Sequence, residues 1–313
     1  MNKLGITLGD PTGIGPEVVK KALINYSPKS LTILYGALPQ NFEFKNLQKI
    51  STPEQATDKN TTYWIPIKEE KKYTHGKPSL KSGLTAFESI EKAGYHAQHN
   101  KISAITTAPL SKKYVQKTNP EFIGHTEFFA KQSNTEHFVM CFYSKKLIVA
   151  LLTTHLALKD LHKELCYAYI YKQIKLVNSS IKKIKNATKP KLALLGVNPH
   201  SGENGSFGTI EIELFEPLVK NLQKNGIDIT GPYSADTFFA SKYKDFDAII
   251  SPYHDQGLIP FKMLTFGEGV NVTLGLPYVR TSVDHGTAFD IAGKNKANCG
   301  SMIEAIKLAE RLI

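Results

Sequence analysis

The sequence lacks two features that would place it in a membrane or outside the cell: a long apolar run and a regular set of cysteines. No stretch reaches the roughly 18 apolar residues that a transmembrane helix requires, so we expect no membrane partner. The three cysteines, Cys141, Cys166 and Cys299, are odd in number and far apart. This pattern is typical of a reducing cytoplasm and gives neither a disulfide framework nor a thiolate zinc site. The opening residues MNKLGITLGD indicate a strand and lack the apolar core of a signal peptide.

The composition is that of an ordinary globular protein with surplus positive charge. The chain has 313 residues, 41% hydrophobic and 21% charged, which is enough for about two domains and a large core. The net charge is +11, and much of the excess falls on a predicted helix between residues 159 and 191, opposite an apolar stripe. No aromatic and basic RNA motif accompanies these lysines, so we expect no nucleic-acid partner. The charge then indicates either a solvated surface or attraction of an anionic small ligand.

Short continuous apolar runs alternate with stretches in which apolar residues recur every three or four positions. This alternation predicts an α/β fold in which helices cover both faces of a mixed, largely parallel sheet. Residues 37–78 are expected to be irregular with short strands. The expected helices are 16–26, 82–99, 159–191, 210–225 and 302–312, and the expected strands are 4–8, 31–35, 102–106, 138–142, 147–152, 192–197, 247–250 and 270–276. Strands 138–142 and 147–152 are expected to form a hairpin or to lie side by side.

The most informative stretch runs from residue 247 to 294, where polar side chains follow buried strands. His254 and Asp255 come directly after one apolar run, and we expect Gly257 to break the chain there. Arg280 follows the next apolar run. A dry, unpaired polar group costs roughly 1–3 kcal/mol, and ligands in α/β sheets bind beyond the carboxyl ends of the strands. The stretch therefore predicts a binding site.

Three histidines each follow a predicted buried strand: His155, His200 and His254. If the strands are neighbours, three imidazoles meet at one edge of the sheet and provide a donor set that suits a borderline divalent cation such as zinc. Their spacings match no short zinc motif, so three unrelated loop histidines are the alternative. In either case Asp236 and Asp255 are candidates to orient imidazole rings from behind.

Two glycine-rich segments, GDPTGIGPE at 9–17 and NPHSGENGSFG at 198–208, allow two interpretations. The first precedes a predicted helix, whose N-terminus favours anions, but it matches neither the dinucleotide fingerprint nor the P-loop. The second places three glycines at three-residue steps, which lets backbone approach a ligand. Tight turns explain both segments equally well.

Several cationic and polar side chains lie among glycines and apolar strands and not on a charged face. Lys262, Asn271 and Arg280 are of this kind. Arginine binds carboxylate or phosphate through paired donors, whereas lysine acts as a point charge or proton carrier. Structural ion pairs are the alternative. His125 and Thr126 follow a glycine and supply possible anion-binding donors, or Thr126 caps the next helix.

Eight segments, taken in order, resemble the motifs of the 4-hydroxythreonine-4-phosphate dehydrogenase family of vitamin B6 biosynthesis. The resemblance extends from Gly9 to Lys294, and only residues 37–78 have no matching segment. Several matches exceed eight residues, so the set is far more specific than any single motif above. The segments are GDPTGIGPE, TAPLSK, GHTE, TTHLALKD, NPHSGENGSFG, GPYSADT, YHDQGLIPFK and NVTLGLPYVRTSVDHGTAFDIAGK.

The resemblance implies a fold like that of isocitrate and isopropylmalate dehydrogenases and a homodimer whose active site lies in a cleft that both subunits line. Residues 1–125 and 265–313 would form the nucleotide-side domain. Residues 126–264 would form the domain that binds metal and dimerises. The segment HGTAFDIAGK resembles the adenine-side NAD loop of those dehydrogenases.

The resemblance also assigns roles to individual positions of this chain. The family's metal histidines fall on His155, His200 and His254, in place of the carboxylates that its dehydrogenase relatives use. Lys262 or Asp255 is the candidate general base. The expected substrate-binding residues are His125, Thr126, Lys262, Asn271 and Arg280, and the expected cofactor-binding residues are His285, Gly286, Asp290, Gly293 and Lys294.

The implied activity is oxidation of 4-phosphooxy-L-threonine by NAD or NADP to a β-keto acid, which loses carbon dioxide to give 3-amino-2-oxopropyl phosphate. The implied cation is zinc, with magnesium, cobalt and manganese as alternatives. The alternative is a sister enzyme that acts on another phosphorylated hydroxy acid, such as threonate 4-phosphate. A phosphometabolite-binding protein without catalysis, or an acyl transferase of similar topology, is the alternative from another class.

Overall fold

The computed structural model describes residues 1–39, 42–68 and 73–313, and the chain divides into two compact units. Unit 1 comprises Met1–Glu136 and Leu276–Ile313, and unit 2 comprises His137–Gly275. The domains expected with bounds at residues 125 and 264 stay a prediction. Helix α4 (His125–Gln132) belongs to unit 1. Its Phe129 is fully buried in a core cluster of that unit.

The strands of unit 1 are parallel and lie in the order β3-β4-β2-β1-β5-β12. Apolar runs without alternation are expected of such strands, because both faces of a parallel sheet are covered. Every residue of β2 and β5 is buried. The strands are β1 (Lys3–Thr7), β2 (Leu31–Gly36), β3 (Leu47–Lys49), β4 (Thr62–Pro66), β5 (Ala104–Thr107) and β12 (Val279–Val283).

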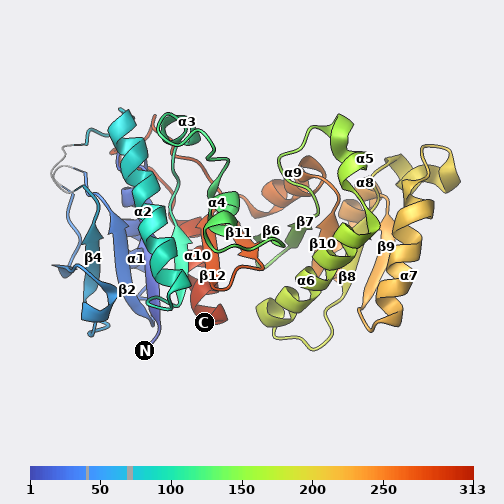
Figure 1. Ribbon diagram of the computed structural model, residues 1–313, viewed down its shortest axis with the longest axis horizontal. Helices are drawn as coiled ribbons and strands as arrows, with labels where there is room; N and C mark the ends of the chain where they lie inside the picture. Colours follow the sequence, from blue (N-terminus) through green and yellow to red (C-terminus); the bar gives the residue numbers. More distant parts are fainter. Residues whose placement is uncertain (40–41, 69–72) are drawn as a thin grey trace. The chain divides into compact units, whose positions relative to one another are not determined.

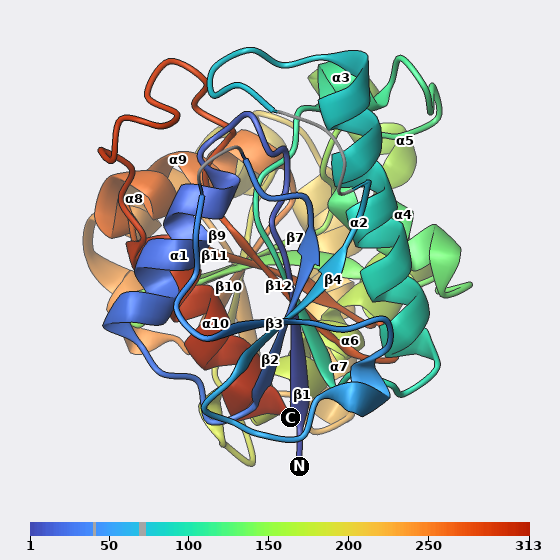
Figure 2. The ribbon, with the colours of Figure 1, turned by 90° about the vertical axis from the view of Figure 1, so that its left-hand side faces the viewer.

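Helices cover both faces of these strands, as Figures 1 and 2 show: α1 and α10 lie on one face and α2 on the other. Successive side chains of a strand point to opposite faces. On β2, Ile33 and Tyr35 accordingly pack with α2 residues, whereas Leu34 packs in the cluster that contains α1 and α10. The helices of unit 1 are α1 (Gly15–Asn25), α2 (Leu80–Gln98), α3 (Lys112–Val115), α4 and α10 (Gly300–Leu312).

Unit 2 has a mixed sheet in the order β11-β6-β7-β10-β8-β9. The predicted hairpin is present, since β6 pairs antiparallel with β7 and also with β11. The pairs of β7 with β10, β10 with β8, and β8 with β9 are parallel. The predicted α/β class with a mixed, largely parallel sheet is therefore confirmed. The strands are β6 (Val139–Tyr143), β7 (Ile148–Leu151), β8 (Leu192–Leu195), β9 (Ile229–Tyr233), β10 (Ala248–Ser251) and β11 (Val270–Leu274).

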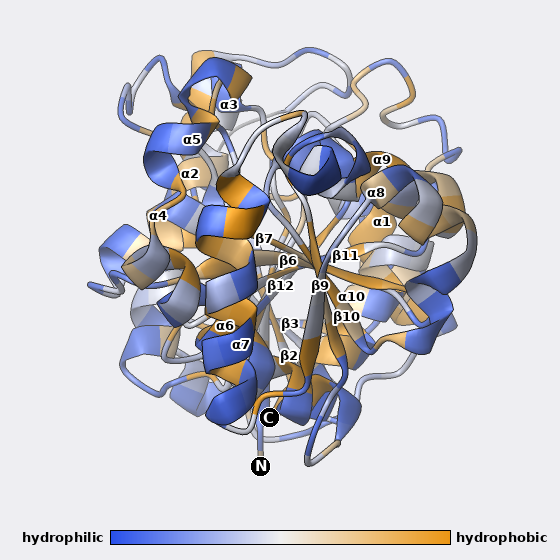
Figure 3. Cartoon of the chain, turned by 90° about the vertical axis from the view of Figure 1, so that its right-hand side faces the viewer, coloured by the Kyte–Doolittle hydropathy of each residue, from blue (hydrophilic) through white to orange (hydrophobic). Residues whose placement is uncertain are grey.

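Helices again lie on both faces of the strands of unit 2, with α6 and α7 on one face and α9 on the other (Figure 3). The apolar stripe predicted on the lysine-rich helix is buried along α6, from Ile170 to Ile184. These helices are α5 (Leu161–Glu164), α6 (Tyr167–Lys185), α7 (Glu216–Lys224), α8 (Ala235–Thr237) and α9 (His254–Thr265).

Three predicted segments differ from the structure. The helix expected over 159–191 is broken into a 3₁₀ turn, α5 and α6, and α6 ends where Asn186 adopts a left-handed φ of 51°. The helix expected over 210–225 begins as a π-helical turn, Glu211–Phe215. Gly257 does not break the chain; it lies inside α9, where a Cβ would stand 2.7 Å from Val149 Cγ1. Glycine therefore allows α9 to approach β7.

The stretch expected to be irregular, 37–78, contains β3, β4 and one 3₁₀ turn, Pro53–Gln55. Residues 40–41 and 69–72 of that stretch lie outside the described residues. None of the helices in the part of the chain that the structure describes is long and apolar enough to cross a bilayer.

Candidate active site

The three strand-end histidines follow neighbouring parallel strands of unit 2. His155 follows β7, His254 follows β10 and His200 follows β8, and β10 pairs with both β7 and β8. Because carboxyl ends of parallel strands share one edge of a sheet, the fold brings the three loops to that edge. The numbers of residues that separate the three histidines in the sequence did not predict this proximity.

Hydrogen bonds tie these three loops together. Thr153, two residues before His155, donates through its hydroxyl to the carbonyl of Pro252 at 2.7 Å. Gln256, within the first turn of α9, donates to the carbonyl of Gly196 at 2.6 Å and accepts from Ser251 Oγ at 2.8 Å. The loops after β7, β10 and β8 are therefore held in one polar network and do not vary independently.

Two of the three imidazoles are neighbours. The ring centroids of His155 and His254 lie 6.2 Å apart. The Nδ1 atom of His254 lies 2.7 Å from Asp255 Oδ1, which leaves Nε2 of that ring for a ligand. A carboxylate behind the imidazole is the usual support of a metal-binding histidine, so the donor chemistry fits a borderline divalent cation. Among the described residues, no three histidine, cysteine or acidic side chains stand close enough together to hold a metal ion.

His200 is carried on an unusual backbone segment. Residues 200–204 all have positive φ, between 42° and 83°, within the turn Pro199–Gly205. For residues other than glycine the left-handed region costs roughly 1–2 kcal/mol each. Such strain is concentrated at functional sites, where the surrounding structure holds it in place. The exposed His200 ring lies 6.2 Å from the Phe207 ring.

The other candidates in unit 2 lie on elements next to these loops. Asp236 lies in α8 and accepts from Ser234 Oγ at 2.6 Å; this hydrogen bond, with a smaller contribution from His200, lowers the pKa of Asp236. Lys262 lies about two turns along α9 from His254, and Asn271 is in β11 opposite Phe142.

Unit 1 contains a buried cationic cluster around Arg280. This side chain is only 2% exposed, and its Nη2 donates to Thr107 Oγ1 at 2.7 Å. Nη1 lies 3.5 Å from Thr126 Oγ1, and the guanidinium lies 5.7 Å from the Phe129 ring centre. Burial lowers the pKa of Arg280 to about 9, although Glu127 and Tyr278 oppose that shift. A guanidinium held dry among hydroxyls is suited to a planar or tetrahedral oxyanion.

His125 and Thr126 begin α4 in this same cluster. Burial lowers the pKa of His125 well below its usual value, and the charges of Arg280 and Lys112 act in the same direction. The imidazole is therefore neutral at pH 7. Its buried Nε2 atom has no hydrogen-bond partner among the described residues, so it remains available to a ligand. Thr126 Oγ1 contacts Arg280, whereas no side-chain cap is present at the start of α4.

The segment predicted to bind the cofactor is an irregular loop of unit 1. Within it, His285 Nδ1 donates to the carbonyl of Gly286 at 3.1 Å, and burial lowers the pKa of His285. Its buried Nε2 has no partner in the described part of the chain. The predicted residues Gly286, Asp290, Gly293 and Lys294 are exposed, as a surface loop for a dinucleotide requires.

The N-terminal glycine segment supports this loop and is not an open cradle. The amide of Ile14 donates to the carbonyl of Thr287 at 3.0 Å. A Cβ on Gly15 would stand 2.2 Å from the carbonyl oxygen of Leu8, and one on Gly13 would stand 2.9 Å from that of Thr287. Protein atoms fill the space beside these glycines, so the structure favours the tight-turn interpretation of GDPTGIGPE.

Two further residues, Thr107 and Glu211, could hardly be singled out from the sequence. Thr107 ends β5 within the segment TAPLSK, and only the fold shows that it contacts Arg280. Glu211 is a buried carboxylate that contacts the loop carrying His200. Thr107 lies in a segment that resembles a family motif and Glu211 lies in a predicted helix, but partner assignments between distant segments require the strand order.

Comparison with known proteins places the chain in a family. Residues 18–309 match the model of the pyridoxal phosphate biosynthetic protein PdxA. The chain is 41% identical to a 4-hydroxythreonine-4-phosphate dehydrogenase of Aquifex aeolicus, over 99% of this chain and 98% of that protein. It is 39% identical to the enzyme of the same name from Sulfurihydrogenibium, over the same shares. A D-threonate 4-phosphate dehydrogenase of Salmonella typhimurium is 35% identical, again over 99% and 98%.

Solved structures agree with these relatives. The 4-hydroxythreonine-4-phosphate dehydrogenase of Klebsiella pneumoniae superimposes with a TM-score of 0.85 at 34% identity and covers 99% of this chain and 98% of that one. An isocitrate dehydrogenase of Methylococcus capsulatus gives a TM-score of 0.53 at 14% identity, covering 97% and 84%. The second match concerns the fold alone, and it agrees with the dehydrogenase-like fold that the sequence predicted.

Proposed function

We infer that this chain, which belongs to the family of the pyridoxal phosphate biosynthetic protein PdxA, is a dehydrogenase that oxidises 4-phosphooxy-L-threonine. The observation that carries the proposal is the set of strand-end histidines in unit 2, with His155 and His254 as neighbours and Asp255 behind one ring. The names of the relatives at 39% and 41% identity support the same substrate.

The cationic cluster of unit 1 is suited to the phosphate of that substrate. Arg280 supplies a buried, charged pair of donors, and Thr126 supplies a hydroxyl beside it. His125 is neutral and cannot add a second positive charge, so it contributes an N–H donor. Because water is largely excluded from these groups, their hydrogen bonds to an anion are strong.

We propose that His155, His200 and His254 hold a divalent cation, zinc or alternatively magnesium, cobalt or manganese. The bound ion supplies Lewis acidity, which lowers the pKa of the substrate hydroxyl and polarises a carbonyl. Asp255 keeps the His254 ring oriented through Nδ1. Asp236 is proposed to assist His200 from behind, in agreement with the electrostatic effect of His200 on its pKa.

The oxidation requires removal of a hydroxyl proton and transfer of a hydride. NAD or NADP accepts the hydride when it is bound. The proposed contacts for it are His285, Gly286, Asp290, Gly293 and Lys294 on the loop that the N-terminal glycine segment supports. Lys262 or Asp255 is the proposed base, and Lys262 and Asn271 are proposed to bind the substrate. The resulting β-keto acid then loses carbon dioxide to give 3-amino-2-oxopropyl phosphate.

We propose a homodimer as the working form. The surface of α9 and the residue that follows it support this, because Ile259, Met263 and Phe266 are 59%, 79% and 93% exposed. Exposed apolar side chains of this size are typical of an interface. Sedimentation of Phe266→Glu tests the proposal: a shift to monomer is expected, and an unchanged dimer would exclude this surface.

A cytoplasmic location without a nucleic-acid partner completes the proposal. The three free cysteines support a reducing compartment. We propose that the net positive charge of the chain attracts its two anionic ligands, the phosphorylated substrate and the dinucleotide.

One steady-state assay tests the function. Purified protein is mixed with 4-phosphooxy-L-threonine or threonate 4-phosphate, NAD or NADP, and each divalent ion in turn, and NADH absorbance is followed. We expect a higher kcat/KM on the amino substrate, and activity that chelation removes and zinc restores. Faster turnover of threonate 4-phosphate would assign the chain to the sister activity, which the relatives favour less. No absorbance change with either substrate would favour the alternative, a phosphometabolite-binding protein without catalysis.

A further inference from the structure

The left-handed turn that carries His200 requires something to hold it. Four of its residues other than glycine, His200, Ser201, Glu203 and Asn204, have φ between 42° and 53°. A short peptide does not adopt such a run by itself, because each residue has a lower-energy conformation nearby. The surrounding structure must therefore fix the turn at specific points.

Glu211 is the principal fixed point. It is only 1% exposed and begins the π-helical turn that precedes α7. Its Oε1 accepts from the amides of Val197 at 2.8 Å and Asn198 at 2.7 Å, and its Oε2 accepts from Asn198 Nδ2 at 3.0 Å. One buried carboxylate thus binds three donors at the entrance of the turn, two residues before His200.

The carboxylate also closes against the inside of the turn. A Cβ at Gly202, where φ is +83°, would stand 2.8 Å from Glu211 Oε2. A Cβ at Gly208 would stand 2.6 Å from Asn198 Nδ2. Gly202 and Gly208 therefore allow the loop to wrap around the Glu211–Asn198 pair.

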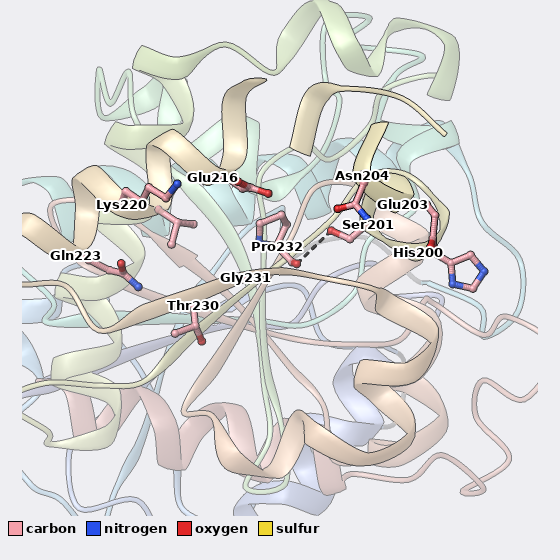
Figure 4. A pocket seen from close by; sticks show the side chains of 11 residues that line it. His200, Ser201, Glu203, Asn204, Glu216, Lys220, Gln223, Thr230, Gly231 and Pro232 are labelled. Atoms are coloured by element: carbon pink, nitrogen blue, oxygen red, sulfur yellow. Dashed lines mark hydrogen bonds between the residues drawn. The ribbon is translucent and has the colours of Figure 1, made fainter. Parts of the chain in front are cut away.

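A second contact holds the far side of the turn. Ser201 Oγ donates to the carbonyl of Pro232 at 3.1 Å, and Figure 4 shows this bond beside the cavity of about 500 Å³ that the turn lines. In that view the His200 ring points away from Lys220 and Gln223. The backbone of the turn is anchored by Glu211 and Ser201, while the imidazole stays exposed.

We propose that Glu211 is a positioning residue: it holds the left-handed turn so that His200 is presented to the divalent cation. The proposal rests on the proposed metal role of His200. It predicts that Glu211 contributes to metal affinity without contacting the metal.

The first test measures metal affinity without turnover. Cobalt(II) is titrated into the full-length protein and into Glu211→Ala and Glu213→Ala, and the ligand-field absorption is followed. Glu213 lies in the same turn and is exposed, so it is the matched control. We expect Glu211→Ala to weaken the Kd about 10–100-fold and Glu213→Ala to leave it unchanged. If the parent protein binds no cobalt, the proposed metal role fails; if both variants bind like the parent, the role of Glu211 fails.

The second test needs no metal. Hydrogen exchange of the Val197 and Asn198 amides is compared in the parent protein and in Glu211→Ala, with the amides of β10 as internal reference. We expect the two amides to lose protection by at least tenfold while β10 keeps its own. Equal protection at Val197 and Asn198 in both proteins would overturn the anchoring role even if cobalt binding is intact.

A double substitution provides a third test, which still applies if Glu211→Ala fails to fold. Asn198→Asp alone opposes two carboxylates and should weaken cobalt binding. In the double variant Asn198→Asp with Glu211→Gln, the amide of residue 211 donates to the carboxylate of residue 198 and its oxygen still accepts from the backbone. We expect the double variant to recover cobalt affinity to within about threefold of the parent. Additive losses in the double variant would contradict the proposal.

Discussion

The histidines of the two units differ in how far the fold buries them. In unit 1, burial lowers the pKa of His96, His125 and His285, and Arg280 nearby is almost wholly enclosed. In unit 2, His155 and His200 are exposed, and the side chain of His254 is 39% exposed. In unit 1 the fold itself removes these polar side chains from water. In unit 2 the unfavourable energy lies in the backbone of the loop that carries His200. The proposed anion site and the proposed metal site are therefore built by different means.

The largest expected effect comes from the proposed anion site. Arg280→Met should lower kcat/KM for the phosphorylated substrate about 10²–10³-fold, because truncating a buried charged partner costs about 2–5 kcal/mol. Arg280→Lys should not restore it, since an ammonium cannot reproduce paired guanidinium donors. Lys81→Met, at an exposed position of the same unit, is the control. A normal kcat/KM in Arg280→Met would exclude a role of Arg280 in binding the phosphate.

A smaller effect is expected from the support of the proposed metal site. Asp255→Asn should weaken cobalt binding about 10–100-fold, because the carboxylate at 2.7 Å orients the His254 ring. Asp245→Asn, exposed in the same unit, should leave affinity unchanged. Isothermal titration of both variants checks this, and equal affinities would show that the His254–Asp255 contact is incidental to binding.

The smallest effect concerns the pH dependence of stability. Burial lowers the pKa of His96 to about 4, helped by Lys92 and Lys101 and opposed by Glu54, and its Nδ1 lies 2.9 Å from Tyr35 Oη. The unfolded chain, with a pKa near 6.5, then binds more protons than the folded one between about pH 6.5 and 4. Stability is therefore full above pH 6.5 and falls as the pH drops.

His96→Gln should consequently lose part of that dependence. Between pH 7 and pH 5 we expect the parent protein to lose about 1–2 kcal/mol more of its unfolding free energy than the variant. Urea unfolding, followed by fluorescence of Trp64 on β4 of the same unit, measures the difference. Parallel pH profiles would mean that His96 accepts a proton in the folded state without cost.

The sequence predicted the helices and strands better than the points where a helix breaks or changes type. The apolar stripe on α6 and the hairpin of β6 and β7 follow from periodicity alone, and both are present. The breaks within 159–191 and at the π-helical turn before α7 were missed, because helical spacing of apolar residues continues across a local change in hydrogen bonding. Gly257 was misjudged because its packing partner, Val149, is distant in sequence.

The candidate site shows the same division. Residue type and position after apolar runs were enough to single out His155, His200 and His254. Their proximity depends on the order β7-β10-β8, which no local pattern encodes. Glu211 and Thr107 escaped notice for a related reason, since an acidic residue in a helical stretch and a threonine at a strand end have many ordinary explanations. Only their hydrogen-bond partners, Asn198 and Arg280, reveal what they do.

The most direct measurement is the cobalt(II) stoichiometry of the parent protein and of His155→Ala, His200→Ala and His254→Ala. His162→Ala, at another exposed histidine of unit 2, is the control. We predict one cobalt ion per chain in the parent and in the control, and at least a 100-fold loss of affinity in each of the three variants. Tight binding that survives all three substitutions, or a parent protein that binds none, would contradict the account.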